Sequence, residues 1–415
     1  MKLAAVAFSA AFAAALMLAG GARAAALSAT DQAAITAMET HVGRIAPAGE
    51  TQTYKTIADR MAELKVPGIS VAVFEHGHVA WAKGYGQATA GGQPVTPDTL
   101  FQAASMSKAL AATAALRLVE QGKLDLDQDV NTRLKAWKVP PSPYTAQSKV
   151  TLRRLLSHTA GMTVSGFPGY AADAPVPSLV QILDGTSPSN TPAIQSYEAP
   201  GGLYAYSGGG FTVAQLLIVE AAGRPYPDLL KTLVLDPAGM QRSTLAQPLP
   251  AALIPGAASG HNRKGEVIPG ARHTYPEYAA AGLWTTPSDY ARFMMALQDA
   301  YAGKPHAILR QASAKTMLTP VDAAAGYALG EVVGRRGGHP YFTHSGGNEG
   351  FQCDSFAFLD GSGQGVVVMT NSDSGGLIAT EMLRALAEAY HWGDPDPANG
   401  KSSRRAPNAP PKPAS

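Results

Sequence analysis

The stretch that most constrains the fold is residues 103–116, which carry a single charged side chain, Lys108. The stretch is rich in alanine and apolar nearly all round, which is typical of a helix buried in a large core. Ser105 precedes Lys108 by three positions, and residues three apart share one face of a helix. A buried ammonium beside a serine hydroxyl can promote its deprotonation, either directly or by supporting a second base. An S-x-x-K pattern also arises by chance about once in a chain of this length, and its lysine is then usually a surface residue. Because the surroundings here are apolar, a catalytic pair is an equal alternative on the evidence of this helix.

Composition excludes several classes of protein. The 415 residues are 46% hydrophobic and 15% charged, with one cysteine, and Lys2 and Arg23 account for the whole excess of basic over acidic residues. Such a chain is too apolar to be disordered and lacks the basic patch that nucleic acid requires. One cysteine forms neither an intramolecular disulfide nor a thiolate zinc site. We therefore expect a large globular protein with no metal, no cofactor and no nucleic-acid partner.

Both ends of the chain lie outside the predicted fold. Lys2, an apolar run to Ala19 and the small-x-small pattern at 22–24 predict a signal peptide over residues 1–24, and a membrane anchor is the alternative. Residues 394–415 are rich in proline and small polar residues, which predicts a disordered tail with Arg404 and Arg405 as a solvated charge pair. The catalytic unit would then span residues 25–393, and the protein would be periplasmic or secreted without a stable membrane anchor.

The order of elements predicts the architecture. An amphipathic helix at 54–64 precedes two apolar runs, 69–74 and 79–82, which are joined by a turn as in a hairpin. Further strands are expected at 356–359 and 366–370, with a closing helix at 377–390. The fold class is therefore α/β (α+β), with an antiparallel sheet built from both chain ends and flanked by helices. The sheet subdomain would comprise about 53–102 and 303–393, and the inserted helical subdomain about 103–302.

Several segments resemble landmarks of the serine β-lactamase and D-Ala-D-Ala peptidase superfamily, in the order expected for that superfamily. They are FQAASMSK at 101–108, VPGISVAV at 66–73, EQGKLDLD at 120–127, LLSHTAGM at 155–162 and GLWTTPSD at 282–289. The branch they most resemble contains class C β-lactamases with D-peptidase and esterase relatives. The resemblance implies the β-lactamase/transpeptidase-like fold, with Ser105 as nucleophile and Lys108 as its partner.

The resemblance also implies a second active-site element, the segment YSGGGF at 206–211. Tyr206 would act with Lys108 as the proton acceptor, because a nearby cation lowers the pKa of a tyrosine. Tyr204 has the same spacing in the wrong register and is interpreted as a packing residue. Gly208 replaces the usual asparagine at the substrate-binding site. It would leave space for a bulkier acyl group, and three consecutive glycines suggest a close backbone approach or positive φ angles.

The third element is THSGG at 343–347, which is similar to the K-T-G or H-x-G strand of the superfamily. By resemblance, His344, Ser345 and Gly346 would contact the substrate, and the amides of Gly347 and Ser105 would form the oxyanion hole. A histidine is mostly neutral near pH 7, so it attracts a substrate carboxylate less than lysine does. We expect residues 166–199 to form much of the pocket wall.

The remaining candidate residues are interpreted as structural. His76 and His78 flank a hairpin turn without a carboxylate or thiolate framework for a metal. His158 would hold a loop by hydrogen bonds, and Cys353 would be a buried apolar side chain. The predicted function is an exported serine hydrolase, esterase or D-peptidase-like, acting on a small-molecule, peptide or cell-envelope-derived substrate. A β-lactamase, an acyltransferase and a non-catalytic penicillin-binding or scaffold protein remain alternatives, and the oligomeric state stays open.

Overall fold

The structure, a computed structural model, describes residues 27–43, 51–394, 396 and 404–408. The predicted signal peptide and most of the predicted tail lie outside these residues. No helix of the described part is both long and apolar enough to cross a bilayer.

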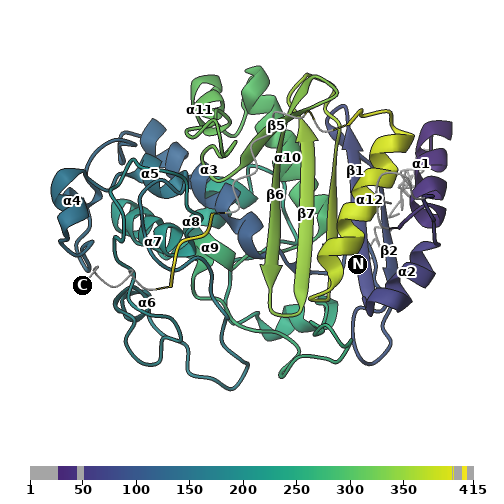
Figure 1. Ribbon diagram of the computed structural model, residues 1–415, viewed down its shortest axis with the longest axis horizontal. Helices are drawn as coiled ribbons and strands as arrows, with labels where there is room; N and C mark the ends of the chain where they lie inside the picture. Colours follow the sequence, from purple (N-terminus) through teal and green to yellow (C-terminus); the bar gives the residue numbers. More distant parts are fainter. Residues whose placement is uncertain (1–26, 44–50, 395, 397–403, 409–415) are drawn as a thin grey trace, which may run out of the picture.

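A six-stranded sheet forms the right-hand half of the molecule in Figure 1, with strand order β2-β1-β8-β7-β6-β5. Every neighbouring pair is antiparallel. The strands are β1 Gly68–Glu75, β2 His78–Gly86, β5 Val332–Arg336, β6 His339–Asn348, β7 Phe351–Phe358 and β8 Gly365–Thr370. The first two come from the N-terminal part and the last four from the C-terminal part, which confirms the prediction of a sheet built from both ends.

The sheet is buried on both faces because its strands are apolar on both. In β8, Val366 and Val368 belong to one core cluster, whereas Val367 and Met369 belong to the other. Successive side chains of a strand point to opposite faces, so a continuous apolar run such as this one serves two cores at once. This explains why the run at 366–370 contains no polar position before Thr370.

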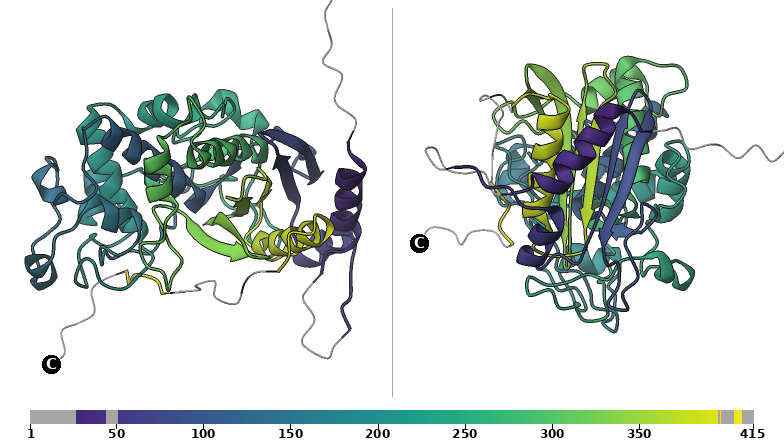
Figure 2. Two further views of the ribbon diagram at one scale, coloured as in Figure 1. Left: turned by 90° about the horizontal axis from the view of Figure 1, so that it is seen from above. Right: turned by 90° about the vertical axis from the view of Figure 1, so that its right-hand side faces the viewer.

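Helices α1, α2 and α12 contribute to one of these cores, and α10 packs on the strands that border the other. Helix α12 (Gly375–Ala389) packs on β7 and β8 and against α1 (Ala29–Thr40), a helix that was not among the predicted elements. Figure 2 shows α1 beside α12 over the sheet. Helix α10 (Pro287–Ala302) packs on β1, β2 and β8.

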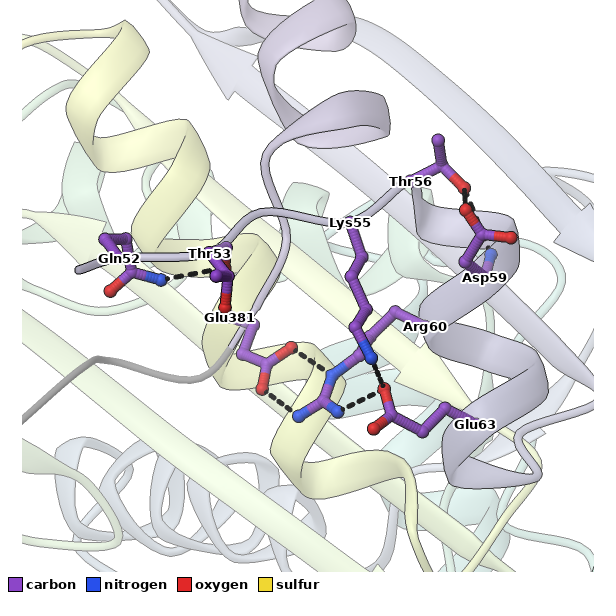
Figure 3. Close-up of polar contacts among 8 residues, drawn as sticks. All are labelled: Gln52, Thr53, Lys55, Thr56, Asp59, Arg60, Glu63 and Glu381. Carbon is purple, nitrogen blue, oxygen red and sulfur yellow. Dashed lines mark hydrogen bonds and ion pairs between the residues drawn. The ribbon is translucent and has the colours of Figure 1, made fainter. Parts of the chain in front are cut away.

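An ion-pair network ties α2 (Ile57–Leu64) to α12 (Figure 3). The Arg60 guanidinium donates to both carboxylate oxygens of Glu381, at 2.8 and 2.5 Å, and to Glu63 at 2.7 Å. Arg60 and Glu381 are both buried, so this bidentate pair is shielded from solvent and holds the N-terminal and C-terminal helices together.

The helical region lies between β1–β2 and β5 in the sequence. Its further elements are α3 Ser107–Glu120, α4 Pro143–Gln147, α5 Leu152–Leu156, α6 Leu179–Asp184, α7 Gly208–Ala222, α8 Tyr226–Leu230, α9 Tyr278–Ala281 and α11 Gln311–Met317. A two-stranded ladder pairs β3 (Phe101–Gln102) with β4 (Trp284–Thr285). Helix α3 is almost wholly buried, as the uncharged run at 103–116 predicted.

The C-terminal residues 404–408 contradict the prediction of a disordered tail, and the predicted solvated charge pair holds only in part, because Arg405 is exposed whereas Arg404 is partly buried. Residues 404–408 form the short yellow segment on the helical side of Figure 1 and lie beside Tyr206. Ala406 is buried against Tyr197 and Ala205. The Arg404 guanidinium pairs with Glu198. Backbone hydrogen bonds and a buried alanine thus hold a segment whose composition predicted disorder.

Candidate active site

The nucleophile candidate Ser105 lies in a tight turn at the start of α3. Residues Ala104–Met106 form a 3-10 turn, and Ala104 has φ 49°, a left-handed conformation unusual for a residue with a Cβ. The Ser107 hydroxyl stabilises the turn by donating to the Ala104 carbonyl at 2.6 Å and accepting from the Leu283 amide at 3.0 Å. Strained backbone of this kind persists where surrounding contacts hold it, often at active sites.

Lys108 lies beneath Ser105, 2% exposed. Its Nζ is 3.0 Å from the Ser105 Oγ and 2.7 Å from the Ala280 carbonyl oxygen on α9. No described carboxylate forms an ion pair with it. Burial, with a smaller contribution from the charge of Arg405, lowers the pKa of Lys108 to about 7. Much of the Lys108 amine is therefore neutral near pH 7 and able to accept a proton.

Tyr206 completes the group predicted from the sequence. The Lys108 Nζ lies 4.9 Å from the centre of the Tyr206 ring. Burial raises the pKa of Tyr206 above its ordinary value, an effect that the hydrogen bond with Ser105 only partly offsets. The phenol therefore keeps its proton near pH 7. Burial therefore disfavours Tyr206 as the proton acceptor at neutral pH, and the catalytic role of Tyr206 stays a prediction.

His158 packs against the Tyr206 ring and hydrogen-bonds to the next residue, Ser207. Its Nδ1 accepts a hydrogen bond from the Ser207 amide at 3.0 Å, and its ring lies 4.3 Å from the Tyr206 ring. The predicted role of His158 in holding a loop is confirmed. Burial keeps the His158 pKa well below its usual range, so this buried ring is neutral.

Strand β6 borders the pocket, and part of its edge has no neighbouring strand among the described residues. Its neighbour β5 pairs only with residues 339–343, so residues 344–348 have no strand partner on that side among the described residues. The pocket has a volume of 480 Å³. Its lining is Ser105, Tyr204, Tyr206, Tyr327, Val332, His344, Ser345, Gly346, Gly347, Gln352, Arg404 and Arg405. The structure thus brings the predicted residues of β6 together with Ser105 and Tyr206.

His344 is held in a neutral state. Its Nδ1 lies 2.6 Å from the Ser345 carbonyl oxygen and its Nε2 lies 3.1 Å from the Tyr327 hydroxyl. A carbonyl only accepts hydrogen bonds, so Nδ1 carries the proton and Nε2 accepts from Tyr327. Burial and the nearby charge of Lys108 lower the pKa of His344 to about 3. His344 therefore offers no positive charge to a substrate carboxylate.

The family model named Beta-lactamase matches residues 54–391, which is most of the chain. The chain belongs to the Beta-lactamase family. D-aminopeptidase of Gluconobacter oxydans (strain 621H) is 27% identical, with 77% of this chain and 59% of the relative covered. Penicillin-binding protein 4 of Amycolatopsis lactamdurans is 25% identical, with 78% of this chain and 86% of the relative covered. The chain spans 59% of the length of D-aminopeptidase, and other curated relatives that it matches are also longer.

Solved structures share the fold of this Beta-lactamase family member. The D-amino acid amidase from Ochrobactrum anthropi SV3 superposes with a TM-score of 0.67 at 22% identity, covering 88% of this chain and 99% of the amidase chain. The octameric penicillin-binding protein homologue from Pyrococcus abyssi gives 0.64 at 23% identity, covering 81% and 76% of the two chains. The expected β-lactamase/transpeptidase-like fold is confirmed.

Gly208 differs from the expectation for this position in the family. A Cβ atom on Gly208 would lie 3.0 Å from the Phe167 ring and 3.2 Å from the Ser165 carbonyl oxygen. Phe167 and the Ser165 backbone thus occupy the space that was expected to be open, and Gly208 does not line the pocket. The three glycines have no positive φ angles, but a Cβ on Gly209 would lie 2.4 Å from the Thr163 carbonyl oxygen. Close backbone approach is therefore the reason for glycine here.

Some of the pocket lining was not predicted. Residues 166–199 contribute none of it, contrary to expectation, and Tyr204, expected only to pack, both packs against Tyr327 and lines the pocket. Tyr327, Gln352, Arg404 and Arg405 were missed as site residues because no local pattern marks them. The Y-x-Y spacing at 204–206 was the one available signal for Tyr204.

The other candidate residues have the predicted structural roles. His76, Gly77 and His78 lie exposed at the hairpin turn between β1 and β2. Among the described residues, no group of three or more histidine, cysteine, aspartate or glutamate side chains could hold a metal ion. Cys353 is buried in β7 and its Sγ lies 3.1 Å from the Ala103 carbonyl oxygen. Burial raises the pKa of this thiol well above its ordinary value, which disfavours the nucleophilic thiolate form.

Proposed function

We propose that this protein is a serine hydrolase that cleaves an ester or amide bond through an acyl-enzyme. The observation that carries the proposal is the buried Lys108 amine, 3.0 Å from the Ser105 hydroxyl and without an ionic partner in the described residues. A lysine desolvated in this way is a base near neutral pH, and a base at hydrogen-bond distance activates a serine.

In the first half-reaction, the neutral Lys108 amine takes the proton of Ser105 as the Oγ attacks the substrate carbonyl carbon. The Ser105 and Gly347 amides are the proposed oxyanion donors, since both residues line the pocket. The Tyr206 phenol keeps its proton and hydrogen-bonds to Ser105. In this scheme Lys108 is the base, and Tyr206 passes the proton to the departing oxygen or nitrogen.

In the second half-reaction, water enters the place of the leaving group and attacks the acyl carbon. Lys108, directly or through Tyr206, accepts a proton from that water, and the Ser105 oxygen is then released and reprotonated. The same groups serve both halves because the two steps are chemically the reverse of one another. An added alcohol or amine in place of water would make an ester or amide, which is the acyltransferase alternative.

An esterase or D-peptidase-like activity is favoured over a β-lactamase. Phe167 occupies the space beside Gly208, where the usual asparagine would bind a substrate carbonyl, and His344 is neutral. Relatives named esterase EstB of Burkholderia gladioli (29% identical over 44% of this chain) and D-aminopeptidase support this order. The substrate would be a small ester, amide or cell-envelope-derived peptide.

Export is a separate part of the proposal and depends on the sequence of residues 1–24 alone. It predicts that protein expressed from the full reading frame is found in the periplasm or medium with a new N-terminus near Ala25. Intact mass of the recovered protein measures this, and a cytoplasmic protein of full mass would refute export.

The catalytic proposal is tested with p-nitrophenyl esters of increasing acyl length beside nitrocefin. Wild type should hydrolyse short esters faster than nitrocefin and show an acyl adduct on Ser105 by intact mass and peptide mapping. Ser105→Ala should lose at least about 10³-fold in kcat/KM, whereas the surface control Ser178→Ala should match wild type. Equal activity of Ser105→Ala and wild type would refute the mechanism. A penicillin adduct that never hydrolyses, with no ester turnover, would indicate the non-catalytic penicillin-binding alternative.

A further inference from the structure

The C-terminal segment 404–408 binds the Tyr206 backbone through an isolated bridge. The Tyr206 amide donates to the Arg404 carbonyl and the Ala406 amide donates to the Tyr206 carbonyl, both at 2.9 Å. These two bonds flank Arg405, which pairs with Tyr206 in a parallel bridge. A third bond joins the Val164 amide to the Pro407 carbonyl at 2.8 Å. Directly paired residues of neighbouring strands share a face, so the Arg405 side chain is directed to the side on which Tyr206 lies.

Arg405 brings positive charge to the pocket. Its guanidinium lies 5.7 Å from the centre of the Tyr206 ring and lines the same cavity as Ser105. Its neighbour Arg404 is neutralised by Glu198, whose Oε1 accepts from Nη1 at 3.0 Å. Arg405 forms no ion pair with the described residues, and no aspartate or glutamate lines the cavity. An anion in the pocket would therefore meet an uncompensated guanidinium.

We propose that Arg405 is a specificity-determining residue, which favours substrates whose leaving group carries a carboxylate. The strand position implied by the sequence, His344, cannot supply this charge because its ring nitrogens are engaged with Ser345 and Tyr327 in the neutral form. The cation is supplied by the C-terminal segment instead. A planar guanidinium suits a carboxylate because it can donate two parallel hydrogen bonds.

The proposed function, on which this inference rests, indicates that the recognised carboxylate belongs to the leaving group and not to the acyl group. Lys108 and Tyr206 return the proton to the leaving group, so the leaving group passes beside the Tyr206 ring. Arg405 and Lys108 both lie against that ring, at 5.7 and 4.9 Å from its centre. A carboxylate attached to the leaving group is thus nearer to Arg405 than one at the far end of the acyl group.

The test compares 3-carboxyphenyl acetate with phenyl acetate, which have the same acyl group and leaving groups of similar acidity. Wild type should show the higher kcat/KM with the carboxylated ester, and added salt should reduce this preference because Arg405 is exposed. Arg405→Gln should lower the ratio of the two kcat/KM values by about tenfold, mainly through KM, as expected for loss of one charge-assisted contact. Arg405→Lys should restore part of the ratio.

The matched control is Arg224→Ala. Arg224 is an exposed arginine just beyond the far end of α7, about 20 Å from Gly208 along the 1.5 Å rise per residue of the helix. This variant should keep the wild-type ratio. An unchanged ratio in Arg405→Gln, or a wild-type preference for phenyl acetate, would overturn the inference.

The inference and the proposed function fail separately. Loss of phenyl acetate hydrolysis in Ser105→Ala tests the hydrolase, whereas the ratio of the two esters tests Arg405. If wild type hydrolyses neither ester, the hydrolase proposal is refuted, and titration calorimetry with 3-carboxyphenyl acetate still decides the role of Arg405. Binding should then weaken by about tenfold in Arg405→Gln, and equal binding would reject the role.

Discussion

A Cβ atom on Gly346 would lie 2.3 Å from the Ala103 carbonyl oxygen. The backbone of strand β6 is therefore in direct contact with the backbone of the turn that carries Ser105. Gly346→Ala should therefore push the strand and the turn apart, and the cost should be about 2 kcal/mol of stability together with at least a tenfold loss in kcat/KM. Urea unfolding and ester hydrolysis measure the two effects.

Gly347→Ala is the matched comparison. The added Cβ at Gly347 would meet the end of the Gln352 side chain at 2.8 Å, and a flexible side chain can move aside at small cost. We expect its loss of stability to be clearly smaller than that of Gly346→Ala. Equal losses would mean that the contact between Gly346 and Ala103 is not a tight constraint.

The pH dependence of ester hydrolysis should report the Lys108 amine. The base must be neutral, and its neutral fraction rises as pH increases through a pKa of about 7. The kcat/KM value should therefore increase between about pH 6 and 8 and level off above. Lys108→Met should reduce activity by about 10²–10⁴-fold at every pH and abolish this acid limb. A limb that persists in Lys108→Met would assign it to another group.

Arg405 should shift the same acid limb. Its positive charge contributes to the lowered pKa of Lys108, so Arg405→Gln should move the limb to higher pH. Phenyl acetate, which has no charge, isolates this effect from substrate recognition. A limb at the wild-type position in this variant would show that the charge of Arg405 is screened at Lys108.

Restoring the usual asparagine at Gly208 should not create a β-lactamase. Phe167 and the Ser165 carbonyl already occupy the space around Gly208, so Gly208→Asn should cost about 1–3 kcal/mol by overpacking and should not raise nitrocefin turnover. The double variant with Phe167→Ala removes the ring that the asparagine would meet and should recover part of the stability. Comparing the thermal stability of the single and double variants shows whether the Phe167 ring is what prevents an asparagine from fitting at position 208.

Glu277 should make the protein less stable as pH rises. It is fully buried, neither carboxylate oxygen has a partner in the described residues, and burial raises its pKa to about 8. The unfolded chain releases this proton near pH 4.5, whereas the folded protein holds it, so stability is lost between about pH 4.5 and 8. Glu277→Gln should therefore be more stable than wild type at pH 8, by on the order of 3 kcal/mol, and close to it at pH 4. A stability difference independent of pH would contradict this.

Local pattern was sufficient for much of the fold and for the centre of the site. The hairpin of β1 and β2, the strand β8 and the helices α3 and α12 follow from runs of apolar residues whose spacing and length suit those elements. The pair of Ser105 and Lys108 is visible in the sequence because three residues span about one helical turn and the helix has no other charge. Helix α1 escaped prediction since its apolar face is narrow and flanked by polar residues.

The electrostatic state of the site was decided only by tertiary structure. The family resemblance suggests a tyrosine base and an open space at Gly208. Burial instead keeps the Tyr206 phenol protonated, lowers the pKa of Lys108 to about 7, and brings Phe167 into that space. Each of these effects depends on what surrounds a group in space, which sequence spacing does not encode.

The C-terminal segment shows most clearly which properties follow from the sequence and which depend on the tertiary structure. Composition correctly marks residues 394–415 as unable to form a core of their own. It cannot indicate that residues 404–408 bind the backbone around Tyr206, some 200 positions earlier, because backbone hydrogen bonds are nearly independent of side-chain type. The sequence by itself determined the candidate nucleophile, Ser105, and its neighbouring Lys108. The fold decided which cation lies beside them, by placing Arg405 against Tyr206.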